Sequence, residues 1–159
     1  MIRILVSACL LGDPVRFDGR AKTVRDSRLE RWAAEGRLVP LCPEVAGGLP
    51  VPRPPAERQP DGRVLDDQGV DRTAAFQLGA QRALEAAQTH GCALAILKEG
   101  SPSCGVARIY DGTFTKQPLA GQGLTTERLK AEGIAVFSEG ELDEAARLVD
   151  VLERMAAEG

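Results

Sequence analysis

Four short apolar runs separated by helical patterns constrain the fold more than any other feature of this 159-residue chain. The runs are Ile2–Ala8, Leu38–Leu41, Ala93–Leu97 and Ile134–Phe137, and each is continuous rather than alternating. Continuous runs of this length are typical of strands that are buried on both faces of a sheet.

Helical patterns lie between these runs. Three of them end at a glycine, which is able to serve as a C-cap: Asp26–Glu35 before Gly36, Asp71–His90 before Gly91, and Thr125–Glu132 before Gly133. A capping box, Ser138 with Glu141 three residues on, predicts the start of a last helix. Strands that alternate with helices predict an α/β fold, a compact Rossmann-like parallel sheet of four or five strands flanked by helices. We expect one domain over residues 1–159.

Two stretches do not show a regular pattern. Pro50–Gly69 is rich in proline and charge, and Glu99–Gly123 contains Gly, Ser, Pro and Thr throughout. Long loops in compact domains are usually functional or disordered. We expect these stretches to form a wall or a lid over a site.

Charge and apolar content restrict the partners and the compartment. The net charge of -3 lacks the basic character of a protein that binds long nucleic acids. The first residues read as a strand rather than as a signal peptide, and no apolar run is long enough for a bilayer. We therefore expect a cytoplasmic protein without membrane contact. Thiols are kept reduced in the cytosol, so the four cysteines favour metal binding or catalysis over disulfides.

Three of the cysteines follow predicted strands. Cys9, Cys42 and Cys104 come after the first, second and third run, whereas Cys92 opens the third run. The carboxyl ends of parallel strands lie at one edge of the sheet, where ligand sites of open α/β sheets are found. We expect Cys9, Cys42 and Cys104 to meet there, and Cys92 to lie at the opposite edge as a small buried hydrophobe.

The count of three thiols indicates the kind of metal centre. Structural zinc normally takes four ligands, and the single histidine, His90, is expected at the surface at a helix end. A cuboidal iron–sulfur cluster normally takes four thiolates, so three would leave one iron open. Spacing alone also allows three independent core thiols.

Polar residues next to these cysteines are candidates for catalysis. Glu44 lies two residues after Cys42, where a carboxylate is able to act as a general acid or base, or remain a solvated loop residue. Ser101 and Ser103 precede Cys104, and their hydroxyls are able to hold a substrate or to make local turn contacts.

Two Asp-Gly pairs have aromatic neighbours. Asp18 follows Phe17, and Asp111 lies between Tyr110 and a short run ending in Phe114. Asp-Gly is first of all a turn signal, but the aromatic rings are able to line a pocket for a flat ring. There is no nucleotide-binding glycine fingerprint, and one histidine gives little support to a serine-protease type of triad.

The chain resembles the thiouracil desulfidases, a bacterial family formerly of unknown function, in its short form. The matching segments run in family order over nearly the whole chain: Cys9-Leu10-Leu11-Gly12, Cys42-Pro43-Glu44-Val45, Gly47-Gly48-Leu49-Pro50, Pro52-Arg53, Leu97-Lys98, Ser101-Pro102-Ser103-Cys104-Gly105 and Tyr110-Asp111-Gly112-Thr113-Phe114.

The resemblance implies a [4Fe-4S] cluster held by three cysteines, matching Cys9, Cys42 and Cys104, with one open iron. It implies a non-redox enzyme that converts a thiolated pyrimidine to uracil and sulfide. The catalytic residues it implies match Glu44 and Ser101, and Ser103 remains an alternative to Ser101. We add Ser103, Asp18 and Asp111 as candidates for substrate binding. Phe17 stands where the family commonly has tyrosine.

Two other functions fit the same cysteines. One is a sulfur carrier or transferase, in which the open iron would hold sulfide for an acceptor. The other is a metal or redox sensor without catalysis, which needs the cysteines but not Glu44. We expect a small-molecule partner, no flavin or nicotinamide, and a monomer or weak homodimer.

Overall fold

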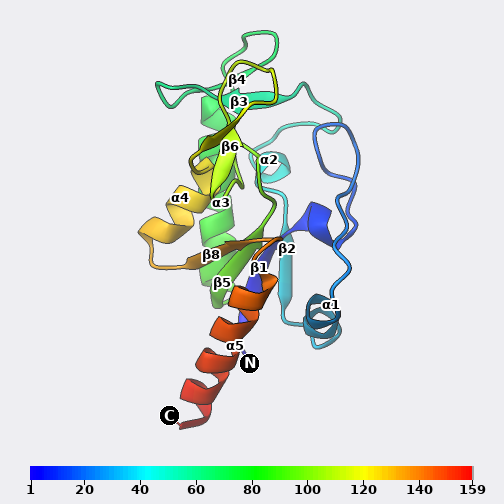
Figure 1. Cartoon of the computed structure of the whole chain (residues 1–159), viewed down its shortest axis with the longest axis vertical. Coiled ribbons are helices and arrows are strands. Elements are labelled where there is room, and N and C mark those ends of the chain that lie inside the picture. The colour runs from blue at the N-terminus through cyan, green and yellow to red at the C-terminus, as the bar shows by residue number, and fades with distance from the viewer. Residues whose placement is uncertain (159) are drawn as a thin grey trace.

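The computed structural model describes residues 1–158, and its centre is a four-stranded parallel sheet in the order β2-β1-β5-β8 (Figure 1). The strands are β1 (Arg3–Ser7), β2 (Leu38–Leu41), β5 (Cys92–Leu97) and β8 (Ala135–Ser138). They coincide with the four apolar runs to within one residue at each end. The predicted α/β class with a parallel sheet is therefore confirmed.

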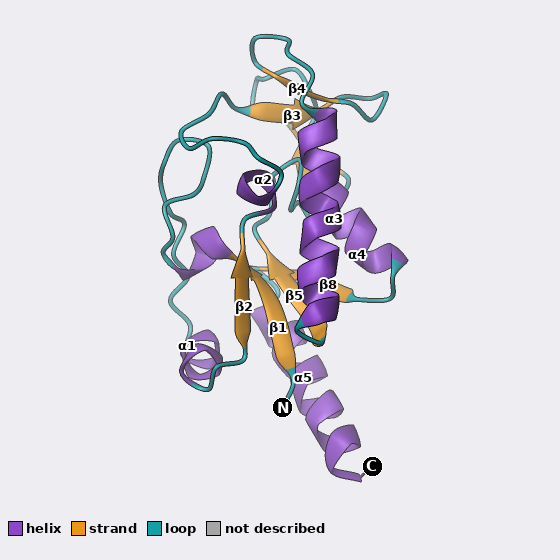
Figure 2. Cartoon of the chain, turned by 180° about the vertical axis from the view of Figure 1, so that it is seen from behind, coloured by secondary structure: helices purple, strands orange, loops and turns teal. Residues whose placement is uncertain are grey.

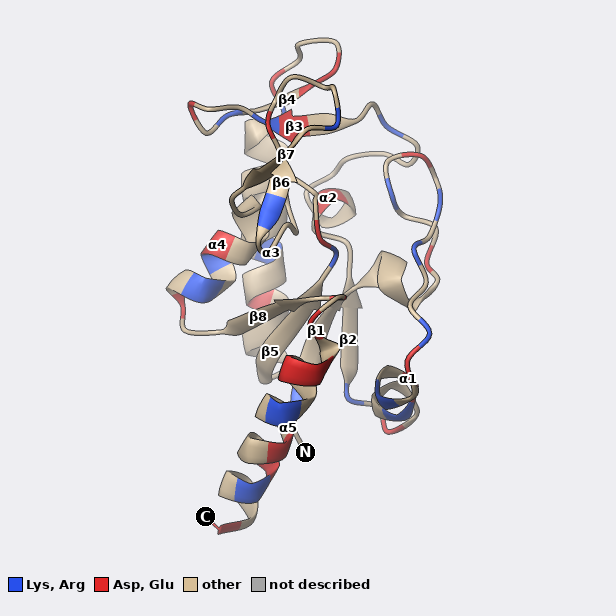
Figure 3. Ribbon diagram, in the orientation of Figure 1, with Lys and Arg blue, Asp and Glu red and all other residues tan. Residues whose placement is uncertain are grey.

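Helices cover both faces of this sheet. Figure 2 shows α3 (Thr73–Thr89) in front of the sheet with α5 (Leu142–Glu158) behind it. The helix α4 (Leu124–Ala131) lies beside α3, and α1 (Ser27–Ala34) lies on the side of α5. Charged residues lie mainly on the helices and loops, whereas the ribbons of the sheet are almost free of them (Figure 3).

Two apolar cores, one on each face, explain the continuous apolar runs. Along β1, Ile4 and Val6 pack with Trp32 of α1, while Leu5 packs with Leu84 of α3 on the opposite face. Because side chains alternate between the faces of a strand, a sheet that is covered twice needs apolar residues at every position.

The start of the last helix differs from the prediction. Ser138 is not its N-cap, because Ser138 still pairs with Leu97 in the sheet and α5 begins only at Leu142. Half of the capping box is present: the Ser138 amide donates to Glu141 Oε1 at 3.0 Å. The Ser138 hydroxyl accepts from the Gly140 amide instead of the Glu141 amide.

Both irregular stretches contain a short antiparallel hairpin. The first holds β3 (Ala56–Arg58) and β4 (Val64–Asp66), and the second holds β6 (Arg108–Tyr110) and β7 (Pro118–Ala120). Three residues are too few for a recognisable alternation, so these strands could not be predicted. Figure 1 shows the hairpins beyond the carboxyl end of the sheet. Within residues 1–158, none of the helices is both long and apolar enough for a membrane crossing.

Two short helices connect the sheet to the region above it. The 3₁₀ helix η1 (Ala8–Leu11) follows β1, and α2 (Pro43–Ala46) follows β2. The backbones of α2 and α3 touch through glycines: a Cβ on Gly79 would overlap the carbonyl of Pro43, and one on Gly47 would overlap that of Ala75. This contact fixes the position of the turn that begins at Cys42.

We predict that Gly79→Ala lowers the free energy of unfolding by about 1–3 kcal/mol, because the new methyl group has no space between α2 and α3. Denaturant unfolding measures this change. Leu78→Ala, at a position that is 42% exposed on the same helix, is the control and should cost about 0.5 kcal/mol or less. Equal effects of the two substitutions would show that the glycine contact is unimportant.

Candidate active site

A cavity of about 370 Å³ opens at the carboxyl end of the sheet. Its walls come from the segments after β1, β2 and β5, and from the two hairpin regions. The chain runs from β1 to β2 on one side of β1, and then crosses to β5 on the other side. Such a switch point is where open α/β sheets bind ligands.

Cys9 and Cys42 enter this cavity directly from adjacent strands. Ser7 and Leu41 are paired at the ends of β1 and β2, so the residues that follow them start side by side. Cys9 lies in η1, which ends at Gly12 with a left-handed φ of 101°. Cys42 is the N-cap residue of α2, and Pro43 occupies the first position of that helix, where its missing amide hydrogen costs nothing.

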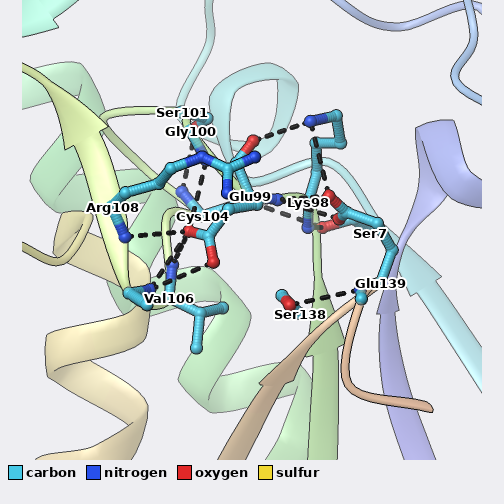
Figure 4. A network of polar contacts seen from close by, with 12 residues as sticks. Ser7, Lys98, Glu99, Gly100, Ser101, Cys104, Val106, Arg108, Ser138 and Glu139 are labelled. Carbon is cyan, nitrogen blue, oxygen red and sulfur yellow. Dashed lines mark hydrogen bonds and ion pairs between the residues drawn. The ribbon is translucent and has the colours of Figure 1, made fainter. Parts of the chain in front are cut away.

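Cys104 is placed by a loop that wraps around the buried side chain of Glu99. This carboxylate, 7% exposed, accepts hydrogen bonds from the amides of Val106, Ala107 and Arg108 at 2.6–3.2 Å (Figure 4). The amide of Glu99 donates to the Glu139 carboxylate at 2.9 Å. Backbone amides thus satisfy the Glu99 carboxylate, which holds the loop without regular secondary structure.

The three thiols are close enough to influence one another. Burial, together with Cys42, raises the pKa of Cys9 from its ordinary 9.0 to about 11, against the opposing charges of Lys98 and Arg16. Burial also raises the pKa of Cys104 and that of Cys42. Within the cavity the thiols are therefore neutral at pH 7 unless a cationic centre compensates the charge of the thiolates.

The arrangement fits a cluster better than a single ion. All three cysteines are free thiols and line one cavity, which argues against three independent core thiols. Among residues 1–158, no three Cys, His, Asp or Glu side chains are spaced to hold one metal ion. A cuboidal cluster takes each thiolate on a different iron and so needs more widely spaced ligands.

Glu44 lies at the centre of a polar group in the same cavity. Its Oε2 accepts two hydrogen bonds from the guanidinium of Arg53, at 2.6 and 2.9 Å, and its Oε1 accepts one from the Ser101 hydroxyl at 3.2 Å. Arg53 has a side chain that is 5% exposed and also donates to the Val15 carbonyl. The ion pair therefore orients one oxygen of Glu44 towards Ser101.

Ser101 and Ser103 have different surroundings. The Ser101 hydroxyl oxygen accepts hydrogen bonds from the amides of Ser103 and Cys104, each at 2.9 Å. The predicted turn contacts are therefore present together with the contact between Ser101 and Glu44. Ser103 is 0% exposed, and its hydroxyl bonds Thr125 of α4 at 2.8 Å. Ser103 thus has no surface through which it could touch a substrate.

The two aspartates are also separated by the structure. Asp18 lines the cavity, as do Phe17 and Tyr110. Asp111 is not part of the lining. Its carboxylate accepts hydrogen bonds from the amide and the hydroxyl of Thr113, and these bonds lower the pKa of Asp111. Asp111 therefore acts as a turn residue, the simpler interpretation of its Asp-Gly pair.

The remaining cysteine and the histidine lie where they were expected. Cys92 pairs with Arg3 at the start of the sheet, at the edge opposite the cavity. His90 is the exposed C-cap residue of α3.

Sequence patterns did not indicate several residues of the cavity wall. Arg53 stands in the matching segment Pro52-Arg53, but its ion pair with Glu44 depends on the fold. Ser7 and Lys116 also line the cavity, as does Lys98, which stands in the matching segment Leu97-Lys98. Lys116 has a left-handed φ of 58°, a conformation that the local sequence does not predict for a lysine.

Fold and site together define an α/β protein with a cavity at the carboxyl edge of its sheet that three free thiols line. The sequence profile of the 2-thiouracil desulfurase family matches residues 4–141, so the chain belongs to that family. The resemblance drawn from the motifs is thus confirmed.

Two individual proteins are similar to this chain over most of its length. A solved structure described as the [4Fe-4S]-dependent thiouracil desulfidase TudS is 51% identical with a TM-score of 0.93, covering 95% of this chain and 99% of its own. The uncharacterized protein YbbK of Bacillus subtilis (strain 168) is 35% identical over 150 residues, covering 89% of this chain and 98% of its own.

We predict that the metal-free protein loses stability as the pH rises from 9.0 to about 11, the interval between the ordinary and the folded pKa of Cys9. Folding favours the neutral thiol, so its contribution is complete below this interval and is lost through it. Thermal unfolding as a function of pH measures the effect. Cys9→Ser is the control and should lose less stability over the same range; an identical loss would contradict the assignment to Cys9.

Proposed function

We propose that this chain is a [4Fe-4S]-dependent thiouracil desulfidase that works without net electron transfer, as a single domain. The overall reaction would take a thiolated pyrimidine and water to uracil and hydrogen sulfide. The observation that carries the proposal is that three free thiols and the Glu44–Ser101 pair line one cavity. Membership of the family and similarity to TudS support it.

Cys9, Cys42 and Cys104 would hold the cluster through three of its irons. When bound, the cluster would supply an open, thiophilic iron that acts as a Lewis acid towards the sulfur of the substrate. The positive field of Lys98 and Arg16, which already favours the thiolate form of Cys9, would also favour the cluster-bound state.

Glu44 would act as the general base for the attacking water. Arg53 holds Oε2, so Oε1 is the oxygen that is left to accept a proton. Two amides occupy the Ser101 oxygen, which directs the hydroxyl proton towards Glu44. Beside Glu44, Ser101 would orient the substrate or the developing charge.

The wall of the cavity would select a flat polar ring. Phe17 and Tyr110 line it and offer aromatic surface, and Asp18 offers an acceptor for the ring N–H groups. Ser103 and Asp111 have no part in substrate binding in this proposal, because Ser103 is completely buried and Asp111 lies outside the cavity lining.

We predict that replacing Cys9, Cys42 or Cys104 singly by Ala lowers the iron and sulfide content after anaerobic reconstitution, because each removes one of only three ligands. Iron content and visible absorbance measure the result. Cys92→Ala is the matched control, since it removes a buried thiol from the other end of β5 and should keep the full cluster. An essential Cys92 together with a dispensable Cys9, Cys42 or Cys104 would contradict the proposed ligand set.

We predict that Glu44→Gln lowers thiouracil turnover per cluster by about 10²–10⁴-fold while the cluster is retained, because the amide cannot accept the proton. Some stability should also be lost, since Arg53 keeps its cavity position without its charged partner. Glu127→Gln is the control: it disrupts a Glu–Arg ion pair with Arg58 outside the cavity and should leave turnover unchanged. Turnover near the wild-type value in Glu44→Gln would remove Glu44 from the mechanism.

The same assays separate the two alternative functions. A sulfur transferase would need an acceptor, so formation of uracil and sulfide from thiouracil alone would speak against it. A sensor would not need Glu44, so a cluster-containing Glu44→Gln variant without turnover would speak against a purely sensory role.

A further inference from the structure

Ser7, the last residue of β1, makes a contact that the proposed reaction does not use. Its side chain is buried with 2% exposure, and its hydroxyl lies 3.5 Å from the Cys104 sulfur. The same oxygen accepts a hydrogen bond from the Lys98 amide at 3.0 Å. Figure 4 shows these residues together, where the ends of β1 and β5 meet the loop that carries Cys104.

The contacts of the Ser7 oxygen determine where its proton points. The Lys98 amide can only donate, so it occupies a lone pair of the hydroxyl oxygen and leaves the single hydroxyl proton free. The Cys104 sulfur is the acceptor that this hydroxyl reaches, and Ser7, although it borders the cavity, is only 2% exposed to water. Ser7 therefore donates to Cys104.

This contact distinguishes Cys104 from the other two thiols. Within residues 1–158, Cys104 is the only cysteine whose sulfur accepts a hydrogen bond from a side-chain hydroxyl. Cys42 instead donates its own proton to the Val15 carbonyl at 3.8 Å, a contact that a thiolate cannot make. The three ligands would therefore differ in the electron density that they offer to the irons.

We propose that Ser7 is a positioning residue that holds the Cys104 thiolate and withdraws electron density from it in the cluster-bound protein. This inference rests on the proposed cluster. A donated hydrogen bond weakens the donation of charge from sulfur to iron, which raises the reduction potential of a cluster and leaves its irons more electron-poor. Ser7 would thereby strengthen the attraction of the open iron for the sulfur of the substrate.

The test uses the reconstituted protein and its reduction potential. Ser7→Ala should shift the potential of the cluster to more negative values in a redox titration followed by electron paramagnetic resonance. Ser138→Ala is the matched control, because Ser138 is a buried serine at the end of the neighbouring strand β8 and its hydroxyl accepts from Gly140 rather than touching a thiol. Its potential should equal that of the wild type. Ser7→Thr keeps the hydroxyl, so its cluster potential should lie close to that of the wild type.

A second readout follows the donated proton itself. In D₂O the Fe–S stretching frequencies of the wild type should shift, and Ser7→Ala should lose part of that shift. Turnover per cluster should fall about 10–100-fold in Ser7→Ala, the usual effect of losing such a supporting contact.

An unchanged potential in Ser7→Ala, or an equal shift in Ser138→Ala, would overturn the role of Ser7 even if the wild type desulfurates thiouracil. A wild-type protein that binds the cluster but has no turnover would overturn the proposed function while a Ser7→Ala shift still supported this inference. A protein that takes up no cluster would overturn both.

Discussion

Parallel pairing of β1 with β2 on one side and β5 on the other is the constraint on which the site depends. Each strand delivers its next residues to the same edge of the sheet, so Cys9, Cys42 and the loop of Cys104 converge although the chain separates them widely. Antiparallel pairing of any of these strands would send one thiol to the opposite edge. The two apolar cores stabilise the sheet from both faces and thereby maintain this convergence.

Buried carboxylates organise the region beyond the sheet, where regular structure is scarce. Glu99 binds the amides of the loop that carries Cys104, and Glu57 binds those of Gly112 and Phe114 at 3.0 and 3.1 Å. Each carboxylate is satisfied by backbone donors, so a long loop obtains the internal hydrogen bonds that a helix or sheet would otherwise supply.

Glu44 differs from these two carboxylates in its partners. Arg53 and Ser101 surround it, and neither is a backbone group that closes a loop. An ion pair on one oxygen and a hydroxyl on the other orient the carboxylate within the cavity. Glu57 and Glu99 thus hold the wall of the cavity, and Glu44 is the glutamate that we propose as the general base.

Local sequence determined the elements that repeat a physical pattern. Four strands follow from apolar runs, and α3 follows from the helical pattern that ends before Gly91. The shared edge of Cys9, Cys42 and Cys104 follows once the sheet is parallel. Tertiary structure decided what depends on distant partners. Ser101 rather than Ser103 contacts Glu44, because the Ser103 hydroxyl is hydrogen-bonded to Thr125 of α4. Arg53 reaches Glu44 because the loop after α2 folds back. The same holds for Ser138, which the pairing of β8 with β5 keeps in the sheet, and for Ser7, whose contact with Cys104 joins residues 97 positions apart.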